Sequence, residues 1–253
     1  MKPSDRSRMH RTPNRRIHPR GSATFEIIYG RNPVMEAITS GSRTFQEIMV
    51  LSQNYDVFSR SVRDIPIRIV QKDELEKLSL SLNHQGIVAK VTPYRYATLG
   101  DMMDLDTLVL LDSVEDPQNL GSIIRSAYAL AGAGIIIPEH RSASVTPAVV
   151  KASSGATEQT RIALVQNLRD ASRELKKHGY WLVGLDAKAQ EDIRRIPRFD
   201  KIGLVLGSED SGIRPIIERE LDLMACIPMK GSFNSLNVAQ AAAVALYELS
   251  ARG

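Results

Sequence analysis

The stretch LDTLVLLDSVEDPQNLGSIIRSAYALAGAGIII, residues 105–137, decides the fold class of this chain. Its first part, residues 105–112, is mainly apolar and predicts a strand. Asp116 is a good N-cap and Pro117 is a good first helical residue, so a helix is expected over 117–132. The apolar run GIII that follows predicts the next strand. A strand, a helix and a second strand in this order are typical of α/β proteins.

The same alternation continues to the end of the chain. Such alternation predicts a mostly parallel sheet with helices on both faces, and the fold class is therefore α/β. The expected strands are 134–137, 162–165, 180–186, 202–207 and 223–229, and the expected helices are 145–155, 167–179, 213–220 and 236–250.

A second, smaller α/β unit precedes this one, over residues 23–96. It opens with FEIIYGRNPVMEAI, which predicts a short strand and then a helix with Asn32 as cap and Pro33 as first helical residue. Further strands are expected at 47–51, 65–70 and 86–94, and a helix at 72–79. A polar linker is placed at 97–104, so the larger unit covers 105–253.

The charge of the chain is concentrated at its beginning. The 253 residues include 33 basic and 29 acidic residues, and seven of the basic ones but only one acidic one fall in the first twenty positions. Residues 1–22 lack a hydrophobic period and are expected to be disordered. This tail is interpreted as an arm that contacts phosphates, as a solubilising leader, or as an organelle transit peptide, because it is rich in Arg and nearly free of acids.

Several classes of protein are disfavoured by what the sequence lacks. One cysteine, Cys226, excludes an internal disulfide and argues against a zinc site, and its apolar neighbours predict a core thiol. The sequence contains no run of about 18 apolar residues, so no membrane span is predicted. Neither G-x-G-x-x-G nor G-x-x-x-x-G-K-[ST] occurs, so chemistry on nicotinamide dinucleotides and nucleoside triphosphates is disfavoured. Aromatic residues are 5%, and Trp181 is expected in a buried strand, so no base-stacking platform is evident.

Three loops follow predicted strands, where parallel sheets bind ligands. The first, 112–121, leads into a helix on which Arg125 points about 145° away from the apolar stripe, with Asn119 at its flank. Both side chains could face a ligand, or they could belong to an ordinary capped helix with a solvated Arg. The second loop, GSEDSG over 207–212, allows close approach of backbone N–H groups but could equally be an acidic turn.

The third loop, 229–237, leads into the last helix. Ser235 is expected to cap that helix, while Asn234 and Asn237 add amide groups at its positive end.

Taken together and in this order, the three loops resemble the SpoU (TrmH-like) branch of the SPOUT methyltransferases. The likeness spans residues 25–250, and it is closest to members that methylate a guanosine ribose in 23S ribosomal RNA. The stretches that carry it are NLGSIIRSA (119–127), GLVLGSEDSGI (203–213) and CIPMKGSFNSLNVAQAAAVALYE (226–248), with HRSASVTPAVVKASSGATE (140–158) and, in the small substrate-binding domain, IYGRNPVMEA (28–37).

The resemblance implies a C-terminal trefoil knot, a homodimer, and S-adenosylmethionine as methyl donor without a metal. By position, it implies that Gly207, Ile227 and Leu236 bind the cofactor, largely through backbone groups. The catalytic and RNA-facing residues that it implies are Asn119, Arg125, Glu209, Ser235 and Asn237. Arg31, Arg141 and Lys151 are expected to form basic clefts for RNA.

The implied reaction transfers a methyl group to a ribose 2′-OH in the cytoplasm, with no DNA or membrane partner. A free guanidinium is a poor base because its pKa exceeds about 12. Arg125 is therefore expected to grip the neighbouring phosphate and polarise the hydroxyl. Asn119 and Glu209 would position Arg125 and the ribose, and Ser235 and Asn237 would form the floor of the site.

Two alternatives remain open: a tRNA ribose methyltransferase of the same branch, and a catalytically silent RNA-binding factor for ribosome assembly. The chain also departs from the family pattern at Asp210, where Gly is frequent, and at Asn234, where Ser is frequent.

Overall fold

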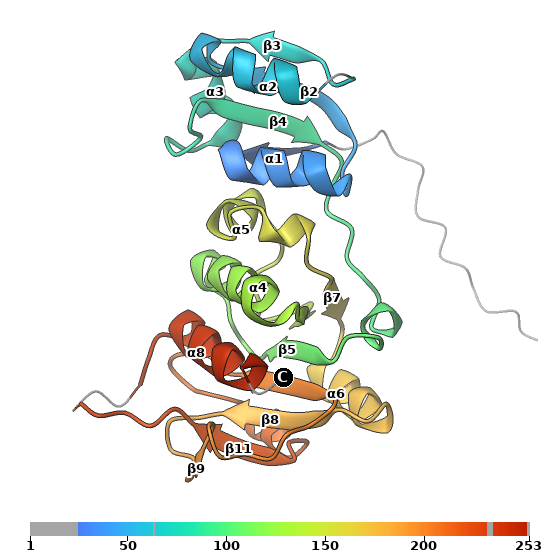
Figure 1. The fold of residues 1–253 in the computed structure, drawn as a ribbon, viewed down its shortest axis with the longest axis vertical. Helices are drawn as coiled ribbons and strands as arrows, with labels where there is room; N and C mark the ends of the chain where they lie inside the picture. Colours follow the sequence, from blue (N-terminus) through green and yellow to red (C-terminus); the bar gives the residue numbers. More distant parts are fainter. Residues whose placement is uncertain (1–24, 63, 232–234, 252–253) are drawn as a thin grey trace, which may run out of the picture.

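The computed structural model describes residues 25–62, 64–231 and 235–251, which form two stacked units (Figure 1). The tail at 1–22 and Asn234 lie outside the described residues. Within the described ranges, none of the helices is both long and apolar enough to cross a bilayer.

The smaller unit contains a four-stranded sheet in the order β1-β4-β2-β3. The β1–β4 and β4–β2 pairs are antiparallel, whereas β2 and β3 are parallel. Its elements are β1 (Glu26–Tyr29), α1 (Arg31–Ser40), β2 (Phe45–Val50), the 3₁₀ turn η1 (Ser52–Asn54), α2 (Tyr55–Ser61), β3 (Ile67–Ile69), α3 (Lys72–Ser79) and β4 (Ile87–Val91).

The larger unit contains a sheet in which the seven described strands are parallel, in the order β7-β6-β5-β10-β8-β11-β9. Its strands are β5 (Thr107–Leu111), β6 (Gly134–Pro138), β7 (Ile162–Val165), β8 (Trp181–Leu185), β9 (Glu191–Asp192), β10 (Ile202–Leu206) and β11 (Leu223–Cys226). Its helices are α4 (Pro117–Ala131), α5 (Pro147–Ala152), α6 (Leu168–Lys177), α7 (Pro215–Glu218) and α8 (Val238–Ser250), with 3₁₀ turns η2 (Gly100–Met102) and η3 (Ala156–Glu158).

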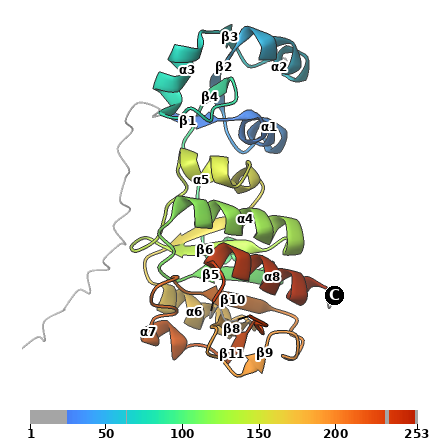
Figure 2. The same ribbon diagram turned by 90° about the vertical axis from the view of Figure 1, so that its left-hand side faces the viewer.

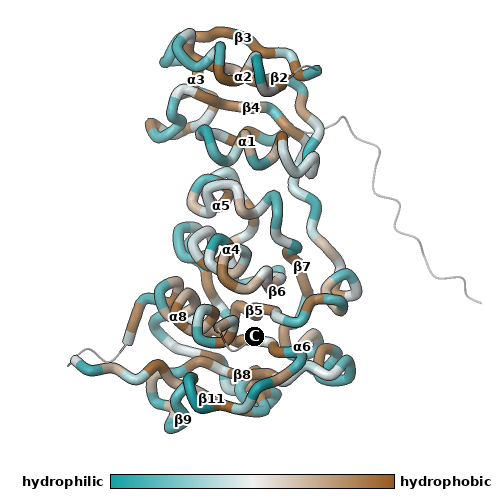
Figure 3. Tube along the Cα trace, viewed as in Figure 1, coloured by the Kyte–Doolittle hydropathy of each residue, from teal (hydrophilic) through white to brown (hydrophobic). Residues whose placement is uncertain are grey.

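Helices cover both faces of the larger sheet, as the sequence predicts (Figure 2). Successive residues of β5 point to opposite faces. Val109 and Leu111 pack with α4 and α8, while Leu108 and Leu110 pack with α6 and α7. The strands are among the most hydrophobic parts of the chain (Figure 3). The central strands are therefore buried on both faces, so a ligand can reach them only at their ends.

Capping sets the start of two helices. Asp116 accepts hydrogen bonds from the backbone N–H groups of Gln118 and Asn119, and α4 begins at Pro117 as predicted. The prediction of Asn32 as the cap of α1 is wrong, because the helix already begins at Arg31. Gly30 adopts a φ of 98°, which turns the chain earlier, and Gln85 Oε1 accepts from the Arg31 N–H at 3.0 Å.

Trp181 is half exposed, so the prediction that its side chain is buried is wrong. It is the first residue of β8 and lies at the edge of the core. Its indole stacks on Phe199 with ring centroids 4.8 Å apart.

A buried ion pair joins the two units. Arg43 donates from Nε and Nη2 to the two carboxylate oxygens of Glu158, each at 2.9 Å, and both side chains are almost fully buried. Arg43 Nη1 donates to Glu26 and to the Thr92 carbonyl, and Ser42 Oγ donates to Glu158. Buried charged groups therefore hold the two units in one orientation.

The segment expected as a linker, 97–104, lies against the larger sheet. Ala97 pairs with Ala163 in a parallel bridge beside β7, and its N–H donates to the Ile162 carbonyl at 2.9 Å. Met102 is fully buried in the core on the α6 side.

Candidate functional site

Three side chains from the three predicted loops meet at the carboxyl ends of the central strands. Asn119 Nδ2 donates to Glu209 Oε1 at 2.8 Å, and Asn237 Nδ2 donates to Asn119 Oδ1 at 3.0 Å. Asn237 Nδ2 also donates to Glu209 Oε1. We call these three residues the Asn119–Glu209–Asn237 cluster. Glu209 Oε1 thus accepts hydrogen bonds from two amide N–H groups. Glu209 Oε2 accepts no hydrogen bond from the described residues, so it is free to accept one from a hydroxyl group.

The helix termini place the two amides. Asn119 lies in the first turn of α4, and Asn237 is the N-cap of α8. Asn237 Oδ1 accepts from the Ala239 N–H at 2.9 Å, which leaves its Nδ2 to reach the cluster. The prediction that Ser235 caps this helix is wrong, because Ser235 lies two residues before the cap and lines the neighbouring cavity.

The loop 207–212 closes on itself and presents Glu209. Ser208 and Gly212 exchange two backbone hydrogen bonds of 3.1 and 3.0 Å, and Ser208 Oγ lies 2.7 Å from Ser211 Oγ. A Cβ added to Gly207 would lie 2.1 Å from the carbonyl carbon of Gly212. Glycine is therefore required at 207, and the hydrogen bonds within the loop hold the turn that presents Glu209.

A buried carboxylate ties the first loop to Arg214, two residues beyond the second loop. Asp112, at the end of β5, is fully buried and accepts from the Arg214 N–H at 2.8 Å and from its Nε at 2.7 Å. Sequence reasoning did not single out Arg214. The available signal was a charged residue that directly follows an apolar strand, since a buried charge needs a partner.

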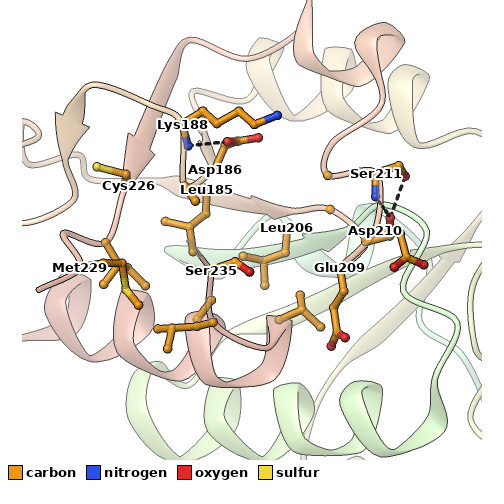
Figure 4. A pocket seen from close by; sticks show the side chains of 18 of the residues that line it. Leu185, Asp186, Lys188, Leu206, Glu209, Asp210, Ser211, Cys226, Met229 and Ser235 are labelled. Carbon is orange, nitrogen blue, oxygen red and sulfur yellow. Dashed lines mark hydrogen bonds between the residues drawn. The ribbon is translucent and has the colours of Figure 1, made fainter. Parts of the chain in front are cut away.

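A cavity of about 720 Å³ opens beside the cluster, at the carboxyl ends of β8, β10 and β11. This volume is within the range of small-molecule sites. All three predicted cofactor residues, Gly207, Ile227 and Leu236, line it, together with Glu209 and Ser235. The side chains labelled in Figure 4 surround this one space.

The cavity lining also includes residues that the sequence did not identify as functional. Asp186 follows β8 and adds a carboxylate to those of Glu209 and Asp210. Cys226 is partly exposed and lines the cavity, so its prediction as a core thiol is wrong. It is the last residue of β11, where the sheet gives way to the cavity. Three carboxylates and one lysine, Lys188, line the cavity, and this excess of negative charge favours a cationic ligand.

Arg125 lies on the exposed side of α4, as predicted. Its Nη1 donates to Ser154 Oγ at 3.2 Å. Among the described residues it makes no hydrogen bond to Asn119 or Glu209, so the expected positioning of Arg125 by these two side chains stays a prediction.

Two of the three predicted RNA-contacting residues are neighbours across the domain junction. Arg31 begins α1, and Lys151 Nζ would lie 2.5 Å from a Cβ built on Gly30. Burial lowers the pKa of Lys151. Arg141 is exposed in the loop after β6. Within the described ranges, no group of three or more His, Cys, Asp or Glu side chains converges as a metal site.

Comparison with known proteins gives consistent matches over both units. A model of the SpoU rRNA methylase family matches residues 106–247, and a model of the RNA 2′-O ribose methyltransferase substrate-binding domain matches residues 27–97. The "Putative TrmH family tRNA/rRNA methyltransferase YacO" of Bacillus subtilis is 35% identical over 240 residues, which cover 90% of this chain and 96% of that protein.

Solved structures also resemble this chain over most of its length. An AdoMet-bound rRNA methyltransferase from Sinorhizobium meliloti has a TM-score of 0.77 and 27% identity, covering 90% of this chain and 87% of that one. The SpoU methyltransferase AviRb from Streptomyces viridochromogenes, in complex with AdoMet, has a TM-score of 0.76 and 26% identity, covering 90% of both chains.

Proposed function

This chain belongs to the SpoU rRNA methylase family and is an AdoMet-dependent RNA methyltransferase, and from this premise we propose that it methylates a ribose 2′-OH of 23S-type ribosomal RNA, at a guanosine. The observation that carries the proposal is the Asn119–Glu209–Asn237 cluster on the rim of the cavity lined by Gly207, Ile227 and Leu236. A polar acceptor beside a cofactor-sized cavity is what a hydroxyl substrate requires.

The cavity residues fit S-adenosylmethionine. The constraint at Gly207 brings main chain rather than a side chain to the cavity wall, which suits recognition of an adenine edge by backbone groups. The carboxylates of Asp186, Glu209 and Asp210 complement the positive charges of the sulfonium and amino groups. When bound, this cofactor supplies a methyl group on an already activated leaving group.

The protein then has to orient the hydroxyl and help remove its proton. Glu209 Oε2 would accept a hydrogen bond from a ribose hydroxyl, and the two amides would hold the carboxylate in the orientation that this bond needs. Arg125 would bind the adjacent phosphate and polarise the 2′-OH, with the phosphate assisting proton removal. Ser235 and Asn237 would form the floor of the site.

RNA binding is proposed to rest on phosphate contacts from three basic side chains. Arg31 and Lys151 would bind across the domain junction and Arg141 beside the larger sheet. The tail at 1–22 would add further charge. Its removal is expected to flatten the salt dependence of RNA binding without changing cofactor binding.

We further propose that the enzyme is a cytoplasmic homodimer with the trefoil knot of its family. Tyr128 on α4 and Val244 and Tyr247 on α8 are large exposed side chains on two helices that pack together. A second copy of the chain would remove this surface from water.

Labelled S-adenosylmethionine incubated with either 23S transcript or tRNA tests the function. We expect label in the 23S transcript, in a nucleotide that resists alkaline cleavage, because a 2′-O-methyl group blocks the attacking hydroxyl whereas a base methyl group does not. Label in tRNA alone would establish the tRNA alternative. RNA binding without label in either RNA would establish the silent assembly factor.

A further inference from the structure

Residues 153–158 follow α5 and include η3, and they contact both α4 and the smaller unit. On one side, α4 approaches closely, since a Cβ on Gly121 would lie 2.4 Å from the Cβ of Ala152. Arg125, one turn further along α4, donates to Ser154 Oγ at 3.2 Å. Arg125 makes no other side-chain hydrogen bond to the described residues, so Ser154 alone orients its guanidinium.

Ser154 keeps an unfavourable backbone conformation. It follows the C-cap of α5 with a φ of 55°, in the left-handed region that favours glycine. Its N–H closes the end of the helix on the Lys151 carbonyl at 3.0 Å. Glycine would satisfy this position without strain, but it would remove the hydroxyl. Ser154 therefore combines a backbone conformation that favours glycine with a hydroxyl that accepts a hydrogen bond from Arg125.

The smaller unit holds the other side of the segment. Gly155 packs so closely on α1 that a Cβ there would lie 2.8 Å from Glu36 Cβ and 3.0 Å from Pro33 Cα. Glu158 forms the buried pair with Arg43, three residues further on. Ser154 is therefore anchored by the smaller unit and cannot follow Arg125 if the guanidinium moves.

We propose that Ser154 is a positioning residue that holds the Arg125 guanidinium in the orientation that binds the target phosphate. This inference rests on the proposed role of Arg125. Serine suits the task because a hydroxyl is a neutral acceptor, so it fixes one N–H of the guanidinium without cancelling its charge. The remaining N–H groups stay available for a phosphate.

The test compares Ser154→Gly with Leu80→Gly. Leu80 is a matched control because it also follows a helix with a φ of 50°, in the smaller unit, and its side chain is 91% exposed. Both substitutions relieve the same kind of strain, so both proteins should melt at or above the wild-type temperature. Only Ser154→Gly should slow single-turnover methylation at saturating RNA, by about tenfold or more, with unchanged cofactor affinity. Ser154→Asn, which tolerates this conformation and restores an acceptor, should recover part of the rate.

The variant Arg125→Ala separates the two levels of the argument. If Arg125→Ala slows methylation to a low but measurable rate and Ser154→Gly matches wild type, the positioning role is overturned and the proposed function stands. If Arg125→Ala turns over normally, the role of Arg125 is wrong and the positioning role with it. The inference requires that Ser154→Gly causes no further loss in the Arg125→Ala background.

Discussion

Replacing Glu158 with glutamine should destabilise the whole protein through the domain junction. The substitution keeps the size of the side chain and removes the charge that faces Arg43, whose side chain is 1% exposed. Burial lowers the pKa of Arg43, but hydrogen bonds and charge attraction from Glu158 and Glu26 outweigh burial and raise it. Arg43 therefore stays charged in the variant and is left partly unpaired.

The magnitude follows from what Arg43 retains. Breaking a buried ion pair by removing one partner costs about 3–5 kcal/mol. Arg43 keeps Glu26 at 2.9 Å and the Thr92 carbonyl at 3.0 Å, which places the expected loss at the lower end, about 3 kcal/mol. For a chain of this size, such a loss lowers the melting temperature by roughly 6–12 °C.

Calorimetric or circular-dichroism melts of the full chain would measure this. Asp104→Asn is the matched control, because it breaks a shorter ion pair, 2.6 Å from Arg161, in which the Asp104 side chain is 71% exposed; its melting temperature should be unchanged. The double variant Arg43→Met/Glu158→Leu should regain most of the loss, since the one charge that loses its partner, Glu26, has a side chain that is 35% exposed and can be hydrated. A Glu158→Gln protein with the same melting temperature as the Asp104→Asn control would refute the reasoning.

Three further outcomes are expected. Gly207→Ala should lower S-adenosylmethionine affinity at least tenfold by calorimetric titration, since the new methyl group collides with the Gly212 backbone; unchanged affinity would remove this loop from the cofactor site. Asn237→Ser should keep the helix cap and the melting temperature but abolish methylation. Asn237→Ala should abolish methylation and also remove the cap, which lowers stability by about 1 kcal/mol. Burial lowers the pKa of His84, so the unfolded state takes up its proton more readily and stability should fall as the pH drops below 6.5. Urea unfolding at pH 7.5 and 5.5 should show this fall, and His84→Asn, which still accepts from Gly86, should reduce it; equal pH dependence of the two proteins would contradict the assignment.

Elements with a strong local signal could be predicted from the sequence. The bounds of α3 and β7 agree with the predicted ranges, because the apolar pattern of each segment and the polar residues next to it mark its ends locally. Boundaries set by distant residues could not. The strand predicted over 223–229 ends at Cys226, because its outer neighbour β9 offers only two residues to pair with.

The same distinction applies to the candidate site. Asn119, Glu209 and Asn237 lie at helix starts or in a glycine loop, so their positions next to strand ends could be inferred from topology. The partners Ser154 and Arg214 could not, since they bond to residues 29 and 102 positions away in the chain. Such contacts depend on how the helices pack, which periodicity does not specify.

The place of β10 beside β5 governs the order in which the chain can fold during synthesis. The smaller sheet has all its strands once Val91 has been made, so that unit can fold early. The larger sheet lacks its centre until β10 pairs with β5, joining Ile202 to Thr107 across a long loop whose closure is entropically slow. Until the ribosome has passed Leu206, the nascent chain would carry one finished domain and an open half-sheet with an unpaired edge, the state in which it most needs a chaperone.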